Sequence, residues 1–111
     1  MAAICDINQN NIRGVIYTET INRTNRVLGC IIGLQNGKYD LYIHTYGDIT
    51  RGCNSIGEPC EFIGTITTCK YGIIYLYIET NISIESMIGK SLSISKNGDV
   101  LACGVIGIGK D

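Results

Sequence analysis

The chain has 111 residues, of which 45% are hydrophobic and 17% charged, and its formal net charge is −1. This composition is too apolar for a disordered chain, and it lacks the basic excess that phosphate backbones require, so we expect no nucleic-acid partner. No apolar run reaches the roughly 18 residues of a membrane-spanning helix, and the first residues do not form a signal peptide. We therefore expect one domain, residues 1–111, with no membrane association and no secretion.

Residue usage favours β-structure. The sequence has 21 Ile against 6 Leu, together with 7 Tyr, 14 Gly and 1 Pro. Ile and Tyr suit strands, whereas Leu, Ala, Glu and Lys are better helix formers. Short β-forming runs alternate with turn signals at close spacing, which is typical of an all-β sandwich or barrel. Eight strands are predicted, at residues 2–7, 13–20, 26–35, 39–45, 61–68, 72–79, 90–95 and 101–107.

Turn signals lie between these strands, at Asn10-Asn11, Asn22 to Asn25, Asn36-Gly37, Tyr71-Gly72 and Asn97-Gly98. An Asn-Gly pair supplies the positive φ angles of a tight hairpin, so we expect residues 26–35 to pair antiparallel with residues 39–45. The stretch 47–60 predicts a loop without regular structure. Residues 81–90 are ambiguous, because their isoleucines allow a short strand followed by a loop.

Alternation within two predicted strands indicates which side chains share a face. In the strand at 39–45, Tyr39, Leu41 and Ile43 alternate with Asp40, Tyr42 and His44. In the strand at 72–79, Ile74, Leu76 and Ile78 alternate with Ile73, Tyr75 and Tyr77. We expect the first set of each strand to lie on one face and the second set on the other.

Candidate catalytic residues are few. His44 is the only histidine, and a histidine metal site usually needs a second imidazole or thiolates. A half-buried side chain hydrogen-bonded to the backbone is therefore the more ordinary interpretation of His44. The carboxylates are scattered and show no pairing suited to acid–base catalysis.

The six cysteines are Cys5, Cys30, Cys53, Cys60, Cys69 and Cys103. None forms a Cys-x-x-Cys pair, so zinc-ribbon and thioredoxin-like sites are not predicted. Cys5 and Cys30 lie within apolar strands and are interpreted as small buried hydrophobic residues. Spacing alone leaves Cys53 and Cys103 reduced, because cytosolic disulfides are uncommon and only the fold could bring the two together.

Two segments resemble signatures of the Cu/Zn superoxide dismutase family. The segment Leu-Ala-Cys-Gly-Val-Ile-Gly-Ile at 101–108 is similar to the family's C-terminal signature. The segment Ile-His-Thr-Tyr-Gly-Asp-Ile-Thr-Arg-Gly-Cys at 43–53 is similar to its copper-site strand and the following loop. Residues 14–17 and 27–34 fit two further strands, so the resemblance covers essentially the whole chain. It implies an eight-stranded Greek-key β-barrel, an immunoglobulin-like sandwich, with Cys53 bonded to Cys103.

The departures from the family pattern fall on its metal site. Tyr42 stands where the family has its first copper histidine, so His44 is a vestigial copper-ligand position. Ser95 aligns with another copper histidine, Phe62 stands near the zinc aspartate, and Val100 replaces the anion-binding arginine. The metal-site and electrostatic loops are also short. One copper ligand of four then remains and no zinc ligand, so the resemblance implies no dismutase activity, no catalytic residue and no cofactor.

The closest resemblance is to the poxviral superoxide-dismutase-like proteins, which are shortened and lack the metal site. It implies a protein of the virion and the host cytoplasm that acts through protein–protein contacts, as a decoy of host dismutase or of its copper chaperone. The expected contact is a homodimer, or a heterodimer with one of those proteins. The residues at the matching interface positions are Ile49, Thr50, Arg51, Gly52, Ile106, Gly107 and Ile108.

Two other hypotheses stay open. The first is a structural virion component with no host target. The second is a residual metal-binding or redox protein that uses His44 with Cys60 or Cys69.

Overall fold

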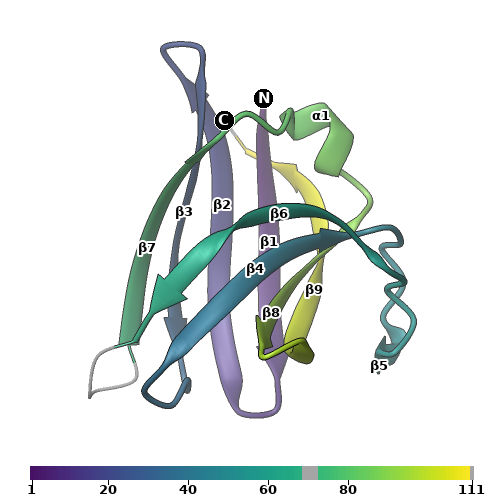
Figure 1. The fold of residues 1–111 in the computed structure, drawn as a ribbon. Helices are drawn as coiled ribbons and strands as arrows, with labels where there is room; N and C mark the ends of the chain where they lie inside the picture. The colour runs from purple at the N-terminus through teal and green to yellow at the C-terminus, as the bar shows by residue number, and fades with distance from the viewer. Residues whose placement is uncertain (69–72, 111) are drawn as a thin grey trace.

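The structure is a computed structural model that describes residues 1–68 and 73–110 (Figure 1). The elements within these residues are β1 (Ala2–Gln9), β2 (Ile12–Ile21), β3 (Thr24–Ile32), β4 (Lys38–His44), β5 (Thr50–Cys53), β6 (Pro59–Thr67), β7 (Ile73–Thr80), α1 (Ile84–Met87), β8 (Ser91–Lys96) and β9 (Asp99–Gly109). All eight predicted strands are present, and β5 and α1 are additional. Cys69 and the predicted turn at Tyr71-Gly72 lie outside the described residues.

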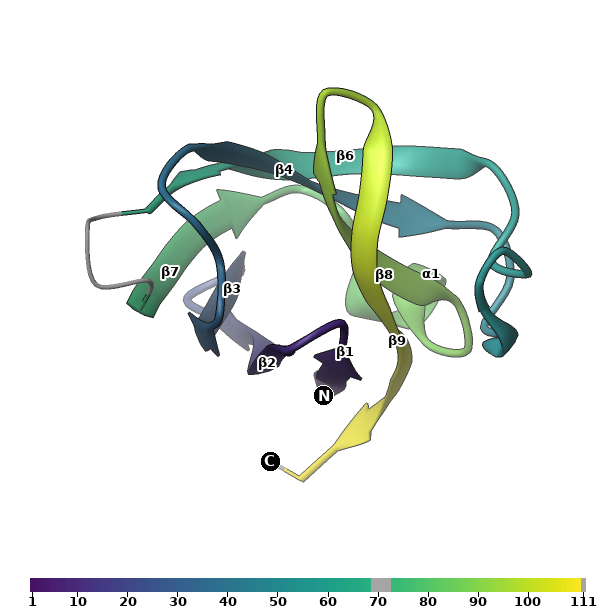
Figure 2. The ribbon, with the colours of Figure 1, turned by 90° about the horizontal axis from the view of Figure 1, so that it is seen from below.

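Eight of the strands form one antiparallel sheet in the order β6-β4-β8-β9-β1-β2-β3-β7, which curls into a nearly closed barrel (Figure 2). The neighbours β4–β8, β9–β1 and β3–β7 are not consecutive in the chain, so the strands are joined by crossover connections in Greek-key fashion. β6 and β7 are the two edges of the sheet. They meet closely, since a Cβ added to Gly64 would lie 3.0 Å from Cδ1 of Ile78. The predicted all-β Greek-key barrel is confirmed.

Three tight hairpins connect sequential strands. Asn10-Asn11, Asn22-Arg23 and Asn97-Gly98 all have positive φ angles, between 52° and 85°. Two successive residues with positive φ form the turn whose twist matches that of paired strands, and Asn tolerates this conformation better than most residues. The turns predicted at these positions are confirmed.

The predicted hairpin at Asn36-Gly37 is wrong. β3 is paired on one side with β2 and on the other with β7, while β4 lies between β6 and β8. Because both edges of β3 are already hydrogen-bonded, the chain after Ile32 cannot fold back onto it. Gly37 instead accepts a backbone hydrogen bond from Thr68 (2.9 Å) and donates one to its hydroxyl (2.8 Å), so the turn is fixed to the end of β6.

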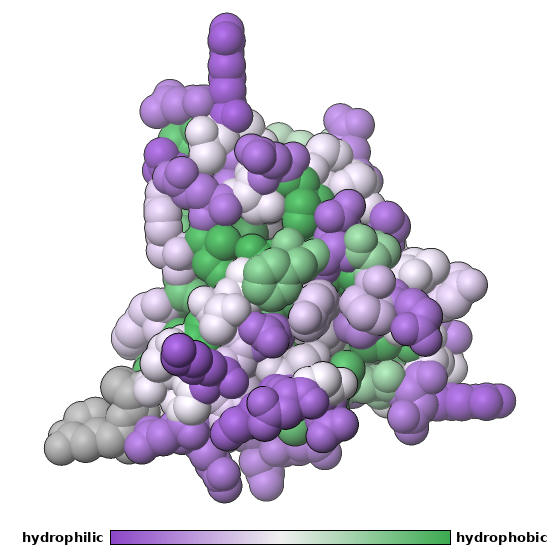
Figure 3. All heavy atoms as spheres, in the orientation of Figure 1, coloured by the Kyte–Doolittle hydropathy of each residue, from purple (hydrophilic) through white to green (hydrophobic). Residues whose placement is uncertain are grey.

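The barrel interior is filled by the inward-facing side chains that alternation predicts. Tyr39, Leu41 and Ile43 are buried, and so are Ile74 and Leu76. Ile73, Tyr75 and Tyr77 point outward, as expected for the opposite set of β7. Figure 3 shows that the outer face over β4 and β6 carries mostly hydrophilic residues around a limited hydrophobic area.

A short helix replaces the strand or loop expected in residues 81–90. The hydroxyl of Ser83 accepts a hydrogen bond from the backbone N–H of Ser86 (3.1 Å) and caps α1. Ile84 and Met87 of α1 are buried and cover one end of the barrel, where Figure 1 places the helix. No helix in the described part of the chain is long and apolar enough to span a bilayer.

Candidate functional site

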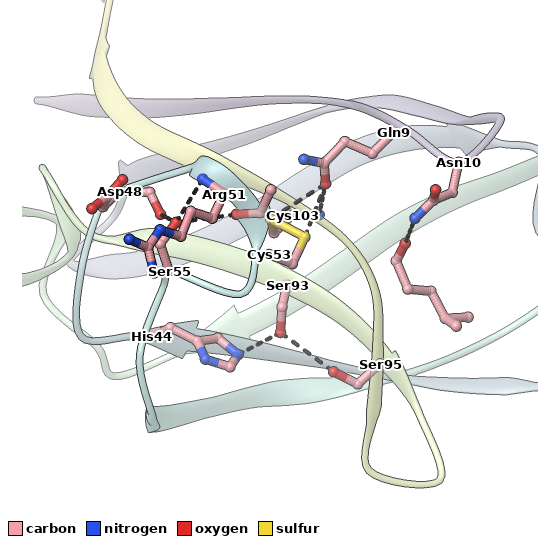
Figure 4. Close-up of a disulfide and its surroundings, with 12 residues drawn as sticks. Gln9, Asn10, His44, Asp48, Arg51, Cys53, Ser55, Ser93, Ser95 and Cys103 are labelled. Atoms are coloured by element: carbon pink, nitrogen blue, oxygen red, sulfur yellow. Dashed lines mark hydrogen bonds between the residues drawn. A yellow bond between two sulfur atoms is a disulfide. The ribbon is translucent and has the colours of Figure 1, made fainter.

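His44 lies at the end of β4 and is buried, with 4% of its surface exposed, rather than half-buried as expected. Its Nδ1 lies 2.9 Å from the carbonyl oxygen of Gly57, and its Nε2 lies 2.7 Å from the hydroxyl of Ser93 (Figure 4). A carbonyl oxygen only accepts hydrogen bonds, so Nδ1 carries a hydrogen, and in the neutral ring Nε2 accepts one from Ser93. Both nitrogens of the ring therefore have protein partners, and the expected hydrogen bond to the backbone is present.

A row of serines continues this polar layer along β8. The hydroxyls of Ser93 and Ser95 lie 3.4 Å apart, and Ser91, Ser93 and Ser95 are all buried. The Ser93–His44 pair has the separation of a nucleophile and its general base. It cannot act as one in this fold, because Ser93 is completely buried and no substrate carbonyl can reach its oxygen. Ser93 and Ser95 fill the layer as hydrogen-bonding groups, whereas the buried hydroxyl of Ser91 has no hydrogen-bond partner among the described residues.

The side chains around His44 are poorly suited to a metal ion. Tyr42 contacts the edge of the His44 ring on one side and packs against Phe62 on the other, with ring centroids 6.4 Å and 5.3 Å apart. In residues 1–68 and 73–110 no three His, Cys, Asp or Glu side chains are close enough to share a metal ion. Cys60 is exposed, and Cys69, the other thiol of the metal-binding hypothesis, lies outside the described residues.

We predict that the protein has no superoxide dismutase activity after incubation with copper and zinc. The reason is that His44 already binds Gly57 and Ser93, while a controlled copper redox cycle needs several fixed ligands. The measurement is a superoxide-consumption assay on metal-treated protein after removal of unbound ions. Activity above that of a matched free-copper buffer, and dependent on folded protein, would contradict the prediction.

The disulfide implied by the family resemblance is present. Cys53 of β5 is bonded to Cys103 of β9, and their Cα atoms are 5.9 Å apart. Gln9, at the end of β1, accepts a hydrogen bond from the backbone N–H of Cys103 at 2.8 Å, and the same Oε1 lies 2.9 Å from the sulfur of Cys53 (Figure 4). Spacing alone left these cysteines reduced, so that expectation is corrected: Greek-key packing brings together residues 50 positions apart.

The disulfide holds the middle of a segment that we call the tethered loop, residues 45–58. Two backbone hydrogen bonds close its base, from Thr45 to Glu58 (3.1 Å) and from Tyr46 to Ile56 (2.9 Å). Ile56, a residue of the loop, has a buried side chain. A Cβ on Gly47 would collide with the backbone carbonyl of Gly89, so glycine lets the loop lie directly against the chain between α1 and β8. The expectation of a stretch without regular structure is thus wrong, since the loop is anchored at both ends and contains β5.

Within the tethered loop, Asp48 organises the turn before β5. Its carboxylate accepts hydrogen bonds from the hydroxyl (2.6 Å) and the backbone N–H (2.9 Å) of Thr50. These bonds stabilise the charged form and lower the pKa of Asp48. The hydroxyl of Ser55 donates to the backbone carbonyl of Asp48 (2.7 Å), which ties the two sides of the turn together.

The seven residues predicted to form an interface divide into two groups. Ile49, Thr50, Arg51 and Ile108 are exposed, and Gly52 and Gly107 are partly exposed. The expectation that Ile106 lies at an interface is wrong, because Ile106 is only 2% exposed and packs in the barrel core. The disulfide joins the strand that carries Thr50–Gly52 to the strand that carries Gly107 and Ile108. We call these six accessible residues the β5–β9 surface.

Sequence reasoning did not identify Gln9, Ser91 or Ser93 as parts of this region. Gln9 lies at the end of a predicted strand, next to a turn, where a polar residue is ordinary. The two serines alternate with the core residues Leu92 and Ile94, so the pattern predicts that they face solvent. In the folded chain the tethered loop lies over β8, and these outward-facing serines are buried. No protein-family model matches the chain.

We predict a defined order of thiol reactivity. Burial, reinforced by the nearby charge of Asp6, raises the pKa of Cys5 to about 12, so its thiolate is scarce at neutral pH. Cys60 is exposed and free, and its thiol should be alkylated before those of Cys5 and Cys30 in the native protein. Peptide mass spectrometry after brief iodoacetamide treatment measures this order, with labelling in denaturant as the control. Native labelling of Cys5 as fast as that of Cys60 would contradict it.

Proposed function

We propose that this protein is a catalytically inactive relative of the Cu/Zn superoxide dismutases that acts by binding another protein. Its partner is a second β-barrel of that family, namely host dismutase or the copper chaperone of that enzyme. The β5–β9 surface makes the contact. The protein would work in the host cytoplasm, and in the virion, as a decoy that occupies a surface its partner normally uses.

The observation that carries this proposal is the contrast between the region's polar and apolar side chains. His44 and the serine layer are buried, and the ring of His44 is fully hydrogen-bonded, so neither offers a group that a substrate can reach. Ile49 and Ile108 instead expose 41% and 73% of their surface. The Cys53–Cys103 bond fixes the tethered loop against β9, so a partner can meet an ordered surface without first having to immobilise it.

The test is retention of purified host dismutase or its copper chaperone by the immobilised protein. We expect the wild-type protein to retain at least one of them and the Ile108→Glu variant to lose it, because a carboxylate at an apolar contact is desolvated without a partner. Phe62→Lys is the matched control, since it also places a charge on an exposed apolar residue, but on β6.

Equal retention by Ile108→Glu and wild type would refute the role of the β5–β9 surface. Retention of neither host protein would refute the decoy function and favour the structural virion component, for which no host target is needed. The resemblance also implies a homodimer through this surface as the alternative contact, and loss of self-association by the Ile108→Glu variant in sedimentation would favour that alternative over the heterodimer.

A further inference from the structure

The sheet formed by β1, β2, β3 and β7 has an apolar outer surface. The strand registers place its outward residues in rows across the sheet. One row joins Ile4, Tyr17, Leu28 and Tyr77, and the next joins Asp6, Val15, Cys30 and Tyr75. We call these eight residues, together with Ile32, the outer sheet face.

Two of the four strands below this face, β3 and β7, have central segments with the sequence pattern of strands covered on both sides. A strand with one solvated face alternates apolar and polar residues, whereas a strand buried on both faces is almost continuously apolar. Residues 27–32 of β3 and 73–78 of β7 contain no charged residue. The inward set already fills the barrel core, so the outward set serves a second apolar contact.

The outer sheet face also has a projection beside a hollow. Tyr75 is 82% exposed, the largest exposed fraction among the large hydrophobic residues described. Its cross-strand neighbour Cys30 lines a hollow of about 360 Å³, together with Gly14, Val15 and Ile32. Asp6 and Arg13 line the same hollow and offer polar groups to a phenol. A tyrosine ring matches this lining, apolar at its walls and polar at its rim.

We propose that the outer sheet face binds a second copy of this chain, with Tyr75 of each copy entering the hollow of the other. An isologous dimer needs a projection and a complementary recess on the same face, and a two-fold axis passing between them exchanges the two. Cys30 borders both features, so this axis brings the two Cys30 thiols near each other.

The size of the outer sheet face and the charge of the chain fit a second copy of this chain as the partner. Five apolar residues of the outer sheet face, Ile4, Val15, Ile32, Tyr75 and Tyr77, each expose 38–82% of their surface. Together they form an apolar patch of several hundred Å², a size at which a surface patch often serves a protein contact. Each chain has a net charge of only −1, so two copies repel each other weakly. Asp6 and Arg13 at the rim supply one charge of each sign.

Sedimentation equilibrium over a wide concentration range tests the proposal. We expect a wild-type dimer and a Tyr75→Lys variant whose dissociation constant is about tenfold higher or more. Val15→Lys should act in the same direction. Phe62→Lys and Ile108→Glu should dimerise like wild type, which separates this face from the β5–β9 surface. Near-ultraviolet circular dichroism verifies that each variant is folded.

A face-specific crosslink provides the second measurement. In a Cys60→Ser/Cys69→Ser background, a short bis-maleimide should join two chains through Cys30, and the additional Cys30→Ser change should abolish the product. The proposal is overturned by a wild-type protein that stays monomeric at its highest soluble concentration. It is equally overturned if Tyr75→Lys dimerises like wild type, or if Ile108→Glu alone abolishes the dimer.

Discussion

Replacing Cys53 with serine should lower the free energy of unfolding by about 4 kcal/mol. The disulfide closes a loop with a sequence separation of 50, and the chain-entropy model assigns that stabilisation to a loop of this length. The loss comes from the greater freedom of the unfolded chain, because Gln9 still accepts the backbone N–H of residue 103 in the folded variant. Urea denaturation at neutral pH measures the change.

Two comparisons make this result specific to the bond. Wild-type protein treated with dithiothreitol should unfold at the same urea concentration as untreated Cys53→Ser. Cys60→Ser, which changes an exposed free cysteine, should stay within about 0.5 kcal/mol of wild type. A Cys53→Ser protein as stable as the oxidised wild type would show that the bond does not restrict the unfolded chain.

Ile106→Ala should destabilise the barrel by about 2–5 kcal/mol, whereas Ile108→Ala should cost less than about 0.5 kcal/mol. The two residues lie on the same strand, but Ile106 is 2% exposed in the core and Ile108 is 73% exposed. Removing Ile106 loses buried apolar contact and leaves a cavity, whereas removing Ile108 does neither. Urea denaturation of both variants measures the difference, and equal losses would contradict the assignment of Ile106 to the core.

This pair of isoleucines also marks the limit of prediction from alternation. Residues 106 and 108 share the parity that selects one face of a strand, so the pattern cannot separate them. Their difference depends on position along the barrel, since Ile108 lies near the end of β9, where the described residues leave most of its side chain uncovered. The family resemblance placed both at an interface, and the structure leaves only Ile108 accessible.

The turn residues predicted correctly the hairpins between strands that are consecutive in the chain. They failed where the connection depends on which distant strands pair. Asn10-Asn11 and Asn97-Gly98 join strands that are neighbours in both sequence and space. Asn36-Gly37 has similar composition, but it belongs to a crossover between strands that do not pair. Nothing within a few residues of that turn encodes the pairing of β3 with β7, which is decided far along the chain.

The burial of the serine layer could not be predicted either. Ser91, Ser93 and Ser95 alternate with apolar residues as solvent-facing positions do, and their burial depends on a loop more than 30 residues earlier in the chain. The pairing of Cys53 with Cys103 has the same origin. Spacing gave no reason for it, whereas whole-chain resemblance implied it because it carries information on the complete fold.

The pairing of β1 with β9 has a consequence for the order of folding. Ala3 pairs with Ile108, and Cys5 with Ile106, so strands near opposite ends of the chain complete each other's hydrogen bonding. During synthesis, β1 and β2 can form their hairpin early, but β1 has an unsatisfied edge until β9 leaves the ribosome. Such non-local closure slows folding, and until it occurs the apolar strands are open to pairing with other chains. The nascent protein should therefore need protection from aggregation until its last strand is available.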